Sequence, residues 1–169
     1  MSSRAESSSE TVLDASVAEF LQQGISVVVA ARDRNNVPTV ARGTGCRVSA
    51  DRRRVSIFIS ATQGEHVLKC IRDNGEIAVV FSMPSTHRTV QVKGKDAVVG
   101  GLEDGDLQRI SDYRDGFARD VSLIGFDELL IQTLLFYPSA DIVSLNFTPS
   151  EAYSQTPGPR AGEPLRSGT

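Results

Sequence analysis

The stretch "FISATQGEHVLKCIRDNG", residues 58–75, joins a strand to a helix through small polar residues. The residues that lead into it, 53–60, alternate along the chain with the period of two that is typical of a strand. Asn74 and Gly75 then have the chemistry of a left-handed helix cap, so the sequence predicts a short helix that begins near Gly64. The corner between the two elements either holds an anion or is a plain turn.

The case for an anion rests on donors. The first amide groups of a helix have no partner within the helix and carry partial positive charge. Side chains that could add donors or charge cluster at the same corner: Ser60, Thr62, Gln63, His66 and Lys69. Glu65, a carboxylate in the same turn, could instead cap the helix, so the corner alone does not decide between the two interpretations.

The segments on either side of this corner indicate the fold class. "ISVVVAARD" (25–33) is apolar on both faces and enters a turn at "RNNVP", and an extended pattern resumes to about Ser49. Together with strand 53–60 this makes a three-stranded meander, and residues 77–100 return to strand. Thr11 and Gly24 would bound an N-terminal helix. The absence of βαβ alternation favours an α+β fold with a mostly antiparallel barrel or sheet.

Length and composition limit the organisation and the class of function. We expect a mobile tail over 1–10, one domain over 11–155 and a Pro/Gly-rich tail over 156–169, with 101–140 helical or irregular. A net charge of -3 and a single basic run, expected to be a hairpin tip, argue against nucleic-acid binding. No apolar run is long enough to span a membrane. The two cysteines are expected to be free and buried, and the cytoplasm is the default compartment.

The second strand is unusual, since Ala41, Gly43 and Gly45 give it a face almost without side chains. Glycines inside a strand mark either a bend or a close approach to the backbone, here that of a flat ring. On the opposite face, Arg42 could bind a phosphate through paired donors or form a surface ion pair.

The strand over residues 88–95 has a polar face, which would meet either a ligand groove or water. No metal-binding motif is present, and His66 and His87 are too few for a metal site. No pair of carboxylates stands out as a general acid and base, so the catalytic residues stay unknown.

The order of these segments resembles the FMN-binding split-barrel family of pyridoxamine 5'-phosphate oxidase and its relatives. The resemblance is carried by "ISVVVAARDRNNVPTVARGTGCRVS", "RRVSIFISATQGEHVLKCIRDNGEIAVVF" and "RTVQVKGKDAVV", over roughly residues 16–100. It implies a mostly antiparallel, six-stranded split β-barrel with flanking helices. It also implies a homodimer with FMN in a groove between the subunits.

The resemblance also implies which residues contact the cofactor. Arg42, Gly43 and Thr44 would face the isoalloxazine ring or the phosphate. The flavin edge would be lined by Ser60, Ala61, Thr62 and Gln63, and His66 takes the place of a phosphate-binding Lys or Arg. Arg88 and Thr89 correspond to the Arg-Gln pair of the oxidase, with Gln91 on the same face.

The function implied is that of an FMN-dependent oxidoreductase that acts on an unidentified small molecule, with NAD(P)H as one possible electron donor. The oxidase itself has a C-terminal substrate motif with Trp, and this chain has no Trp. That difference argues against oxidation of pyridoxamine phosphate. The alternative is a non-catalytic module on the same fold that binds flavin or haem as a sensor.

Overall fold

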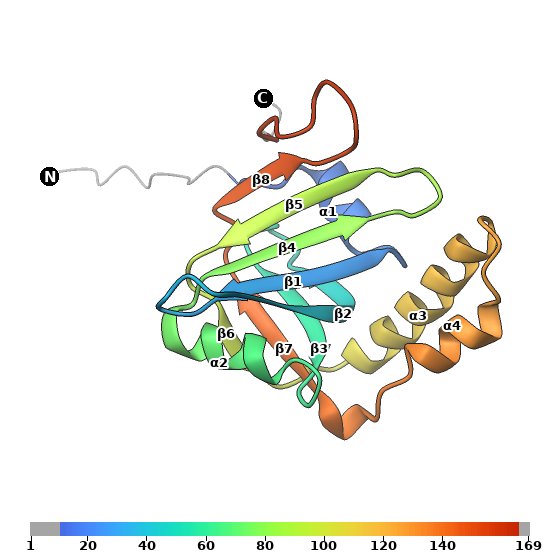
Figure 1. Cartoon of the computed structure of the whole chain (residues 1–169), viewed down its shortest axis with the longest axis horizontal. Helices are drawn as coiled ribbons and strands as arrows, with labels where there is room; N and C mark the ends of the chain where they lie inside the picture. Colours follow the sequence, from blue (N-terminus) through green and yellow to red (C-terminus); the bar gives the residue numbers. More distant parts are fainter. Residues whose placement is uncertain (1–10, 166–169) are drawn as a thin grey trace, which may run out of the picture.

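The computed structural model describes residues 11–165, which form an eight-stranded antiparallel sheet and four α-helices (Figure 1). The strands are β1 Ser26–Arg32, β2 Pro38–Val48, β3 Val55–Ser60, β4 Ile77–Ser82, β5 Thr89–Gly94, β6 Val98–Gly100, β7 Ile142–Phe147 and β8 Glu151–Ser154. The helices are α1 Ala15–Leu21, α2 Glu65–Asn74, α3 Asp106–Ser122 and α4 Glu128–Leu134, and a 3-10 turn, η1, covers Ser139–Asp141.

Strand β2 connects the two halves of the sheet, because each part of it pairs with a different neighbour. Residues 38–42 of β2 pair with β1, residues 43–48 pair with β3, and the register shifts between Gly43 and Cys46. The strand order is β6-β7-β3-β2-β1-β4-β5-β8, with β6 and β8 as the outer edges, so the sheet is not closed. The predicted α+β class and antiparallel pairing are confirmed.

The predicted count of six strands is wrong, because two segments each divide between the halves of the sheet. The run predicted as one strand over 88–100 breaks at Asp96, whose carboxylate accepts a hydrogen bond from the Thr148 amide at 2.8 Å. Its first part becomes β5 and pairs with β4, while its second part becomes β6 and pairs with β7. The last strands, β7 and β8, likewise lie in different halves, beside β3 and β5.

The main hydrophobic core lies inside the bent sheet, where β1, β4 and β5 turn alternate side chains inward. Its largest fully buried members include Phe20, Phe81, Phe147, Ile57 and Leu145. Two helices complete the enclosure, α1 through its buried Phe20 and Leu21 and α2 through Val67 and Ile71.

The helix ends follow local chemistry, with one correction. Helix α2 ends at Gly75, whose φ of 70° is the left-handed cap that the sequence predicted. Helix α1 begins one turn later than expected: its N-cap is Asp14, whose carboxylate accepts from the Val17 amide at 2.7 Å, and Thr11 lies outside the helix. The basic run at 51–54 lies in the β2–β3 hairpin tip, as predicted.

The region 101–140 forms the α3–α4 hairpin beside the sheet (Figure 1). Helix α3 packs against β2 and buries Tyr113 and Phe117. Helix α4 lies on α3 and has no buried residue of its own. Among residues 11–165, no helix is long and apolar enough to cross a membrane.

The chain beyond β8 stays close to the sheet from residue 156 to residue 165. It folds back, and the Leu165 amide donates to the Ala152 carbonyl at 2.8 Å while the Gly162 amide donates to Ser154 at 2.6 Å. The prediction of a mobile segment over 1–10 lies outside the described residues.

Candidate functional site

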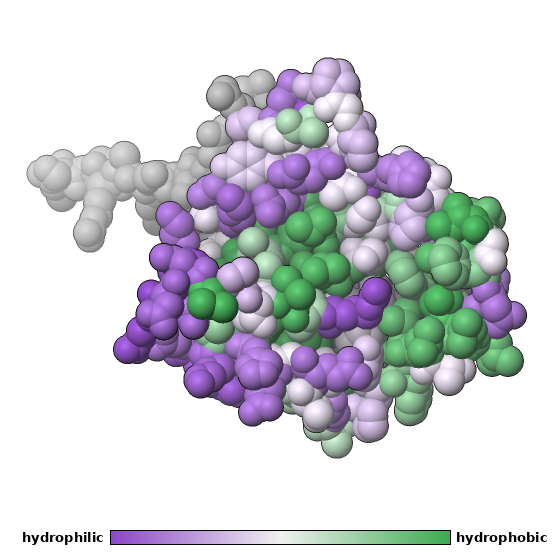
Figure 2. Space-filling view, viewed as in Figure 1, coloured by the Kyte–Doolittle hydropathy of each residue, from purple (hydrophilic) through white to green (hydrophobic). Residues whose placement is uncertain are grey.

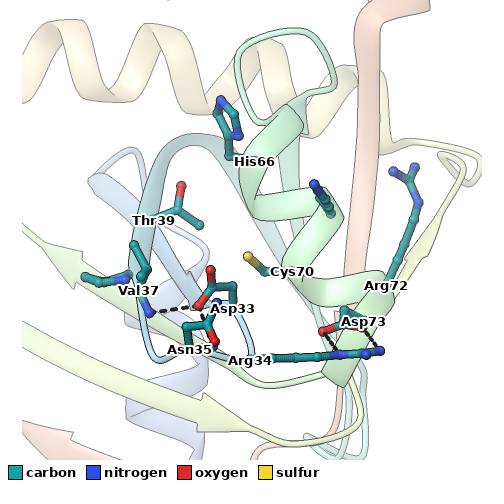
Figure 3. A pocket seen from close by; sticks show the side chains of 11 residues that line it. Asp33, Arg34, Asn35, Val37, Thr39, His66, Cys70, Arg72 and Asp73 are labelled. Carbon is teal, nitrogen blue, oxygen red and sulfur yellow. Dashed lines mark hydrogen bonds and ion pairs between the residues drawn. The ribbon is translucent and has the colours of Figure 1, made fainter.

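A groove opens where the first half of β2 has a strand partner on one side only. Residues 38–42 pair with β1, and across the open side lies α2 rather than a strand (Figure 3). The groove has a volume of about 760 Å³. It is lined by the β1–β2 hairpin, residues 33–39, and by one side of α2, from His66 to Asp73.

The β1–β2 hairpin wall is held by its own turn. One carboxylate oxygen of Asp33 accepts from the amides of Asn35, at 2.8 Å, and Val37, at 2.9 Å. Asn36 has a φ of 61°, a conformation that asparagine adopts more readily than most residues. The "RNNVP" turn predicted from sequence therefore shapes one side of the groove.

The α2 wall is cationic. Arg34 crosses the groove to Asp73, with Nε and Oδ2 at 2.9 Å, so that this carboxylate is neutralised. Lys69 and Arg72 have no carboxylate within ion-pair distance among residues 11–165, and His66 lies in the first turn of the helix. Positive side chains on one wall favour an anionic ligand.

The corner at Ser60–Gln63 holds an anion, and that anion belongs to the protein. The Asp141 carboxylate accepts from the hydroxyls of Ser60 and Thr62 and, at 3.0 Å, from the Thr62 amide. The Asp141 carbonyl accepts from the Ala61 amide at 2.6 Å. The Gln63 amide donates to the Ser60 hydroxyl at 3.1 Å. The donors proposed for a flavin edge are thus already engaged, except for the side chain of Gln63.

These hydrogen bonds also change the acidity of Asp141. They stabilise the ionised carboxylate and lower its pKa below the ordinary value for aspartate, with the bond from the Ser60 hydroxyl as the largest cause. Asp141 therefore stays ionised at neutral pH, and it ties η1 to the corner that precedes α2.

The glycines of β2 serve the bend of the strand, which corrects the flat-ring interpretation. A Cβ atom at Gly43 would lie 2.6 Å from Cγ1 of Val27. One at Gly45 would lie 3.1 Å from the Phe58 ring, and the φ of Gly45 is 138°. The protein's own side chains fill the space over both glycines, so no ring can lie against them.

Three aromatic residues that sequence analysis did not single out surround the outer side of β2. The Arg42 guanidinium lies 5.9 Å from the centre of the Phe117 ring, which stacks on Tyr113. Tyr137 donates to the Gln63 side chain at 3.4 Å. The only sequence signal for them was the presence of aromatics in a segment with weak helical periodicity.

Two buried hydroxyls in this region lack hydrogen-bond partners among the described residues, those of Thr44 and Tyr113. Burial raises the pKa of the Tyr113 hydroxyl well above that of a free tyrosine. Buried polar groups are normally paired, but both hydroxyls are enclosed by the protein and neither lines the groove.

The remaining predicted residues lie along the sheet, away from the groove. In the strand register Arg42 faces Val28, Val28 faces Val80 and Val80 faces Gln91, so three strand spacings, roughly 14 Å, separate Arg42 from Gln91. Thr89 shares a hydrogen bond with Ser82 at 2.9 Å, and the Arg88 guanidinium covers the Phe20 ring at 4.1 Å. A single chain does not bring the predicted set together.

Metal-ligand side chains do not gather in groups of three or more within residues 11–165. Both cysteines are buried and free, as predicted, and Cys70 lines the groove.

No family model and no curated protein match this chain, but solved structures do. An F420 reductase matches with a TM-score of 0.52 and 14% identity over 79% of this chain and 93% of the other. HupZ of Group A Streptococcus has a TM-score of 0.52 and 13% identity over 89% and 99%. A candidate pyridoxamine 5'-phosphate oxidase of Lactobacillus delbrueckii has a TM-score of 0.50 and 17% identity over 83% and 93%. At these identities the likeness shows the fold alone.

Proposed function

We propose that this chain, which has the split-barrel fold of pyridoxamine 5'-phosphate oxidase-like proteins, binds a flavin and that the flavin is FMN. The observation that carries the proposal is the cationic groove at the open side of β2. Its volume, about 760 Å³, is in the range of cofactor sites. A planar ligand with a phosphate suits a groove that has positive side chains on one wall and a hairpin on the other.

The phosphate end fits the first turns of α2 better than the preceding corner. His66 and Lys69 have no carboxylate partner among the described residues, and the first amides of α2 receive no capping side chain. Ser60 and Thr62 do not fit this role, because Asp141 already accepts their hydrogen bonds and its negative charge repels a phosphate.

The ring end fits the outer side of β2, where the exposed Arg42 side chain and the side chain of Gln63 offer polar atoms. A bound flavin accepts and donates a hydride. In that chemistry Arg42 would stabilise negative charge on the reduced ring, and Gln63 would hold its orientation. Gly43 supplies the bend that places Arg42.

The predicted set is completed by a second copy of the chain. Thr89, Gln91 and Arg88 lie too far from the groove to act with it in one chain, and in a homodimer they would approach the ligand of the other copy. As in the sequence analysis, the expected substrate is a small organic molecule, NAD(P)H is one possible electron donor, and the cytoplasm is the default compartment.

The visible spectrum of the purified protein, and of protein reconstituted with FMN, tests the proposal. We expect flavin absorbance with about one FMN per chain. His66→Lys should tighten binding by several fold, because lysine keeps its full charge at neutral pH, and Lys69→Ala should weaken it about ten-fold. Arg52→Ala, at the far hairpin tip, is the matched control and should change nothing.

The same measurements decide between the alternatives. Bleaching of the flavin by NADPH or NADH supports an oxidoreductase, whereas bound flavin that no nicotinamide reduces supports the non-catalytic module. A Soret band would show haem instead. Failure of FMN to bind at micromolar concentration would overturn the proposal.

A further inference from the structure

The α3–α4 hairpin presents a large apolar surface that the single chain leaves uncovered. We define the hairpin surface by its exposed members, Leu123, Ile124, Phe126, Leu129, Leu130, Leu134 and Phe136. Each is between 49% and 77% exposed. With roughly 150–250 Å² for a full side chain of this size, the exposed area amounts to about 800 Å². A patch of that size marks an interaction site.

A second apolar surface lies on the outer face of the sheet. We define the sheet surface as Val28, Ala30, Val40, Ala78 and Val80, which are neighbours in the strand register. The inner sides of β1 and β4 are buried in the core, while these outer residues are only half-buried or, for Val40, 66% exposed. No helix covers this face in Figure 1. Residues 25–33 are therefore apolar on both faces of the sheet, but only the inner face is covered by the rest of the chain.

Both surfaces are visible on one side of the molecule, the sheet surface at the centre and the hairpin surface beside it (Figure 2). When two copies meet face to face about a two-fold axis that passes between the surfaces, each hairpin lies on the sheet of the other copy. An area of about 800 Å² for each partner is what a standard stable interface buries. Each of the two surfaces would then cover the other.

Charge favours this arrangement over two others. The chain has no Lys or Arg from residue 120 to 159, whereas Asp127 and Glu128 stand at the start of α4. Pairing hairpin with hairpin would bring these carboxylates together. Arg42, beside the sheet surface, has no carboxylate partner among the described residues and is complementary to them. A helix that binds membrane surfaces usually carries basic residues along its polar face. Helix α4 carries none, and Arg114 of α3 lies over the Phe136 ring, 5.6 Å from its centre.

We infer that the hairpin surface of one copy docks on the sheet surface of a second copy, and that this contact forms the homodimer. The inference rests on the proposed homodimer and not on the identity of the ligand. It brings the aromatic side of the partner's hairpin next to Arg42, and so makes the ring end of the groove a site shared by two chains.

Sedimentation velocity over a range of concentrations tests the contact. Leu129→Asp and Leu134→Asp together should raise the dimer dissociation constant at least ten-fold, because each would place an unpaired carboxylate in an apolar interface. Leu107→Asp is the control: Leu107 is 53% exposed near the start of α3, about 24 Å along the helix from Leu123, and it lies outside the hairpin surface. Circular dichroism checks that all variants stay folded.

Cross-linking identifies the pairing. Val40→Cys and Leu134→Cys chains, mixed after subunit exchange and treated with a short bismaleimide, should give a Val40–Leu134 cross-link. Both chains also carry Cys70→Ala, because Cys70 lines the groove, whereas Cys46 is buried. A Leu134–Leu134 product in its place would overturn the pairing in favour of two hairpins. A chain that is monomeric at every concentration, or that floats with phosphatidylcholine vesicles, would overturn the interface.

Flavin content is measured on the same samples. A dimer without flavin would support the interface and contradict flavin binding. A monomer that binds flavin would support flavin binding and contradict the interface.

Discussion

A single carboxylate, that of Asp141, accepts the hydrogen bonds from both hydroxyls at the corner between β3 and α2 and from the Thr62 amide. The corner thus has the chemistry of an anion site, although its anion comes from η1. Sequence analysis identified Ser60 and Thr62 as potential donors to an anion, and in the structure both donate to a carboxylate of the chain itself. It could not identify the acceptor, which lies about eighty residues away in a segment without a recognisable motif.

This carboxylate makes the stability of the protein depend on pH. The folded pKa of Asp141 is lowered, so its contribution is fully present above the ordinary aspartate pKa and is lost as the pH falls through the folded pKa. Asp141→Asn should lower the urea midpoint at pH 7, and the difference from wild type should shrink as the pH falls below about 4.

Asp14→Asn serves as the control for that prediction. It keeps a side-chain acceptor at the N-cap of α1, and asparagine caps helices about as well as aspartate, so the midpoint should barely move. A loss for Asp141→Asn that stayed constant from pH 7 to pH 3 would contradict the role of the charge.

The two cysteines provide a probe of the groove. Cys46 is buried, and burial raises the pKa of its thiol, so only the rare unfolded chain should react with a thiol reagent. Cys70 lines the groove from α2. We expect one thiol to react at least ten-fold faster than the other, and Cys70→Ala to remove the fast phase.

Saturation with FMN should slow the fast phase if the ligand fills this groove. Equal reaction rates for the two thiols would show that the groove is closed in solution. A fast phase that FMN leaves unchanged would place the ligand elsewhere.

At the scale of the element, β2 decides the shape of the site. Gly43→Val should destabilise the protein by about 1–3 kcal/mol, because the added atoms overlap Val27 in a filled core. Gly45→Ala should cost about 1–3 kcal/mol as well, for a different reason: its φ of 138° strains any residue with a Cβ atom.

Gly101→Ala is the matched control for both, since a Cβ atom there would meet nothing within 4 Å. It should change the free energy of unfolding by less than about 0.5 kcal/mol in urea denaturation. Wild-type stability for Gly45→Ala would mean that the bend of β2 is not held at this residue.

Alternation predicted β3, although both of its faces are buried, and a run of β-branched apolar residues predicted β1. The same alternation could not reveal the division of residues 88–100 into β5 and β6. That break depends on the hydrogen bond from Thr148 to Asp96, a contact between distant parts of the chain. The local pattern also left open whether the β2 glycines serve a bend or a ligand.

At the scale of the whole molecule, the order of strands predicted the split-barrel fold. The cofactor-binding residues implied by the family resemblance, however, do not lie together in one site of a single chain. Arg42 and Gln91 lie on the same face with Val28 and Val80 between them. Sequence neighbours show which face a strand residue occupies. They do not show the distance across strands, or which surfaces a second chain covers.

Association predicts a thermal stability that depends on concentration. If the hairpin surface docks on a second copy, the midpoint of thermal unfolding should rise with protein concentration by a few degrees for each hundred-fold increase. The double variant Leu129→Asp, Leu134→Asp should show a midpoint that does not change with concentration. A constant midpoint for wild type, measured by scanning calorimetry from 1 to 100 µM, would contradict a reversible dimer.

The open side of β2 has a consequence for how the protein behaves when its groove is empty. Backbone groups of residues 38–42 that point away from β1 have no strand beside them, and such an edge can recruit an extended segment of another molecule. Pro38 at the first position and the positive charges of α2 oppose this recruitment. A ligand in the groove would shield the edge altogether, so preparations saturated with ligand should resist aggregation better than empty ones.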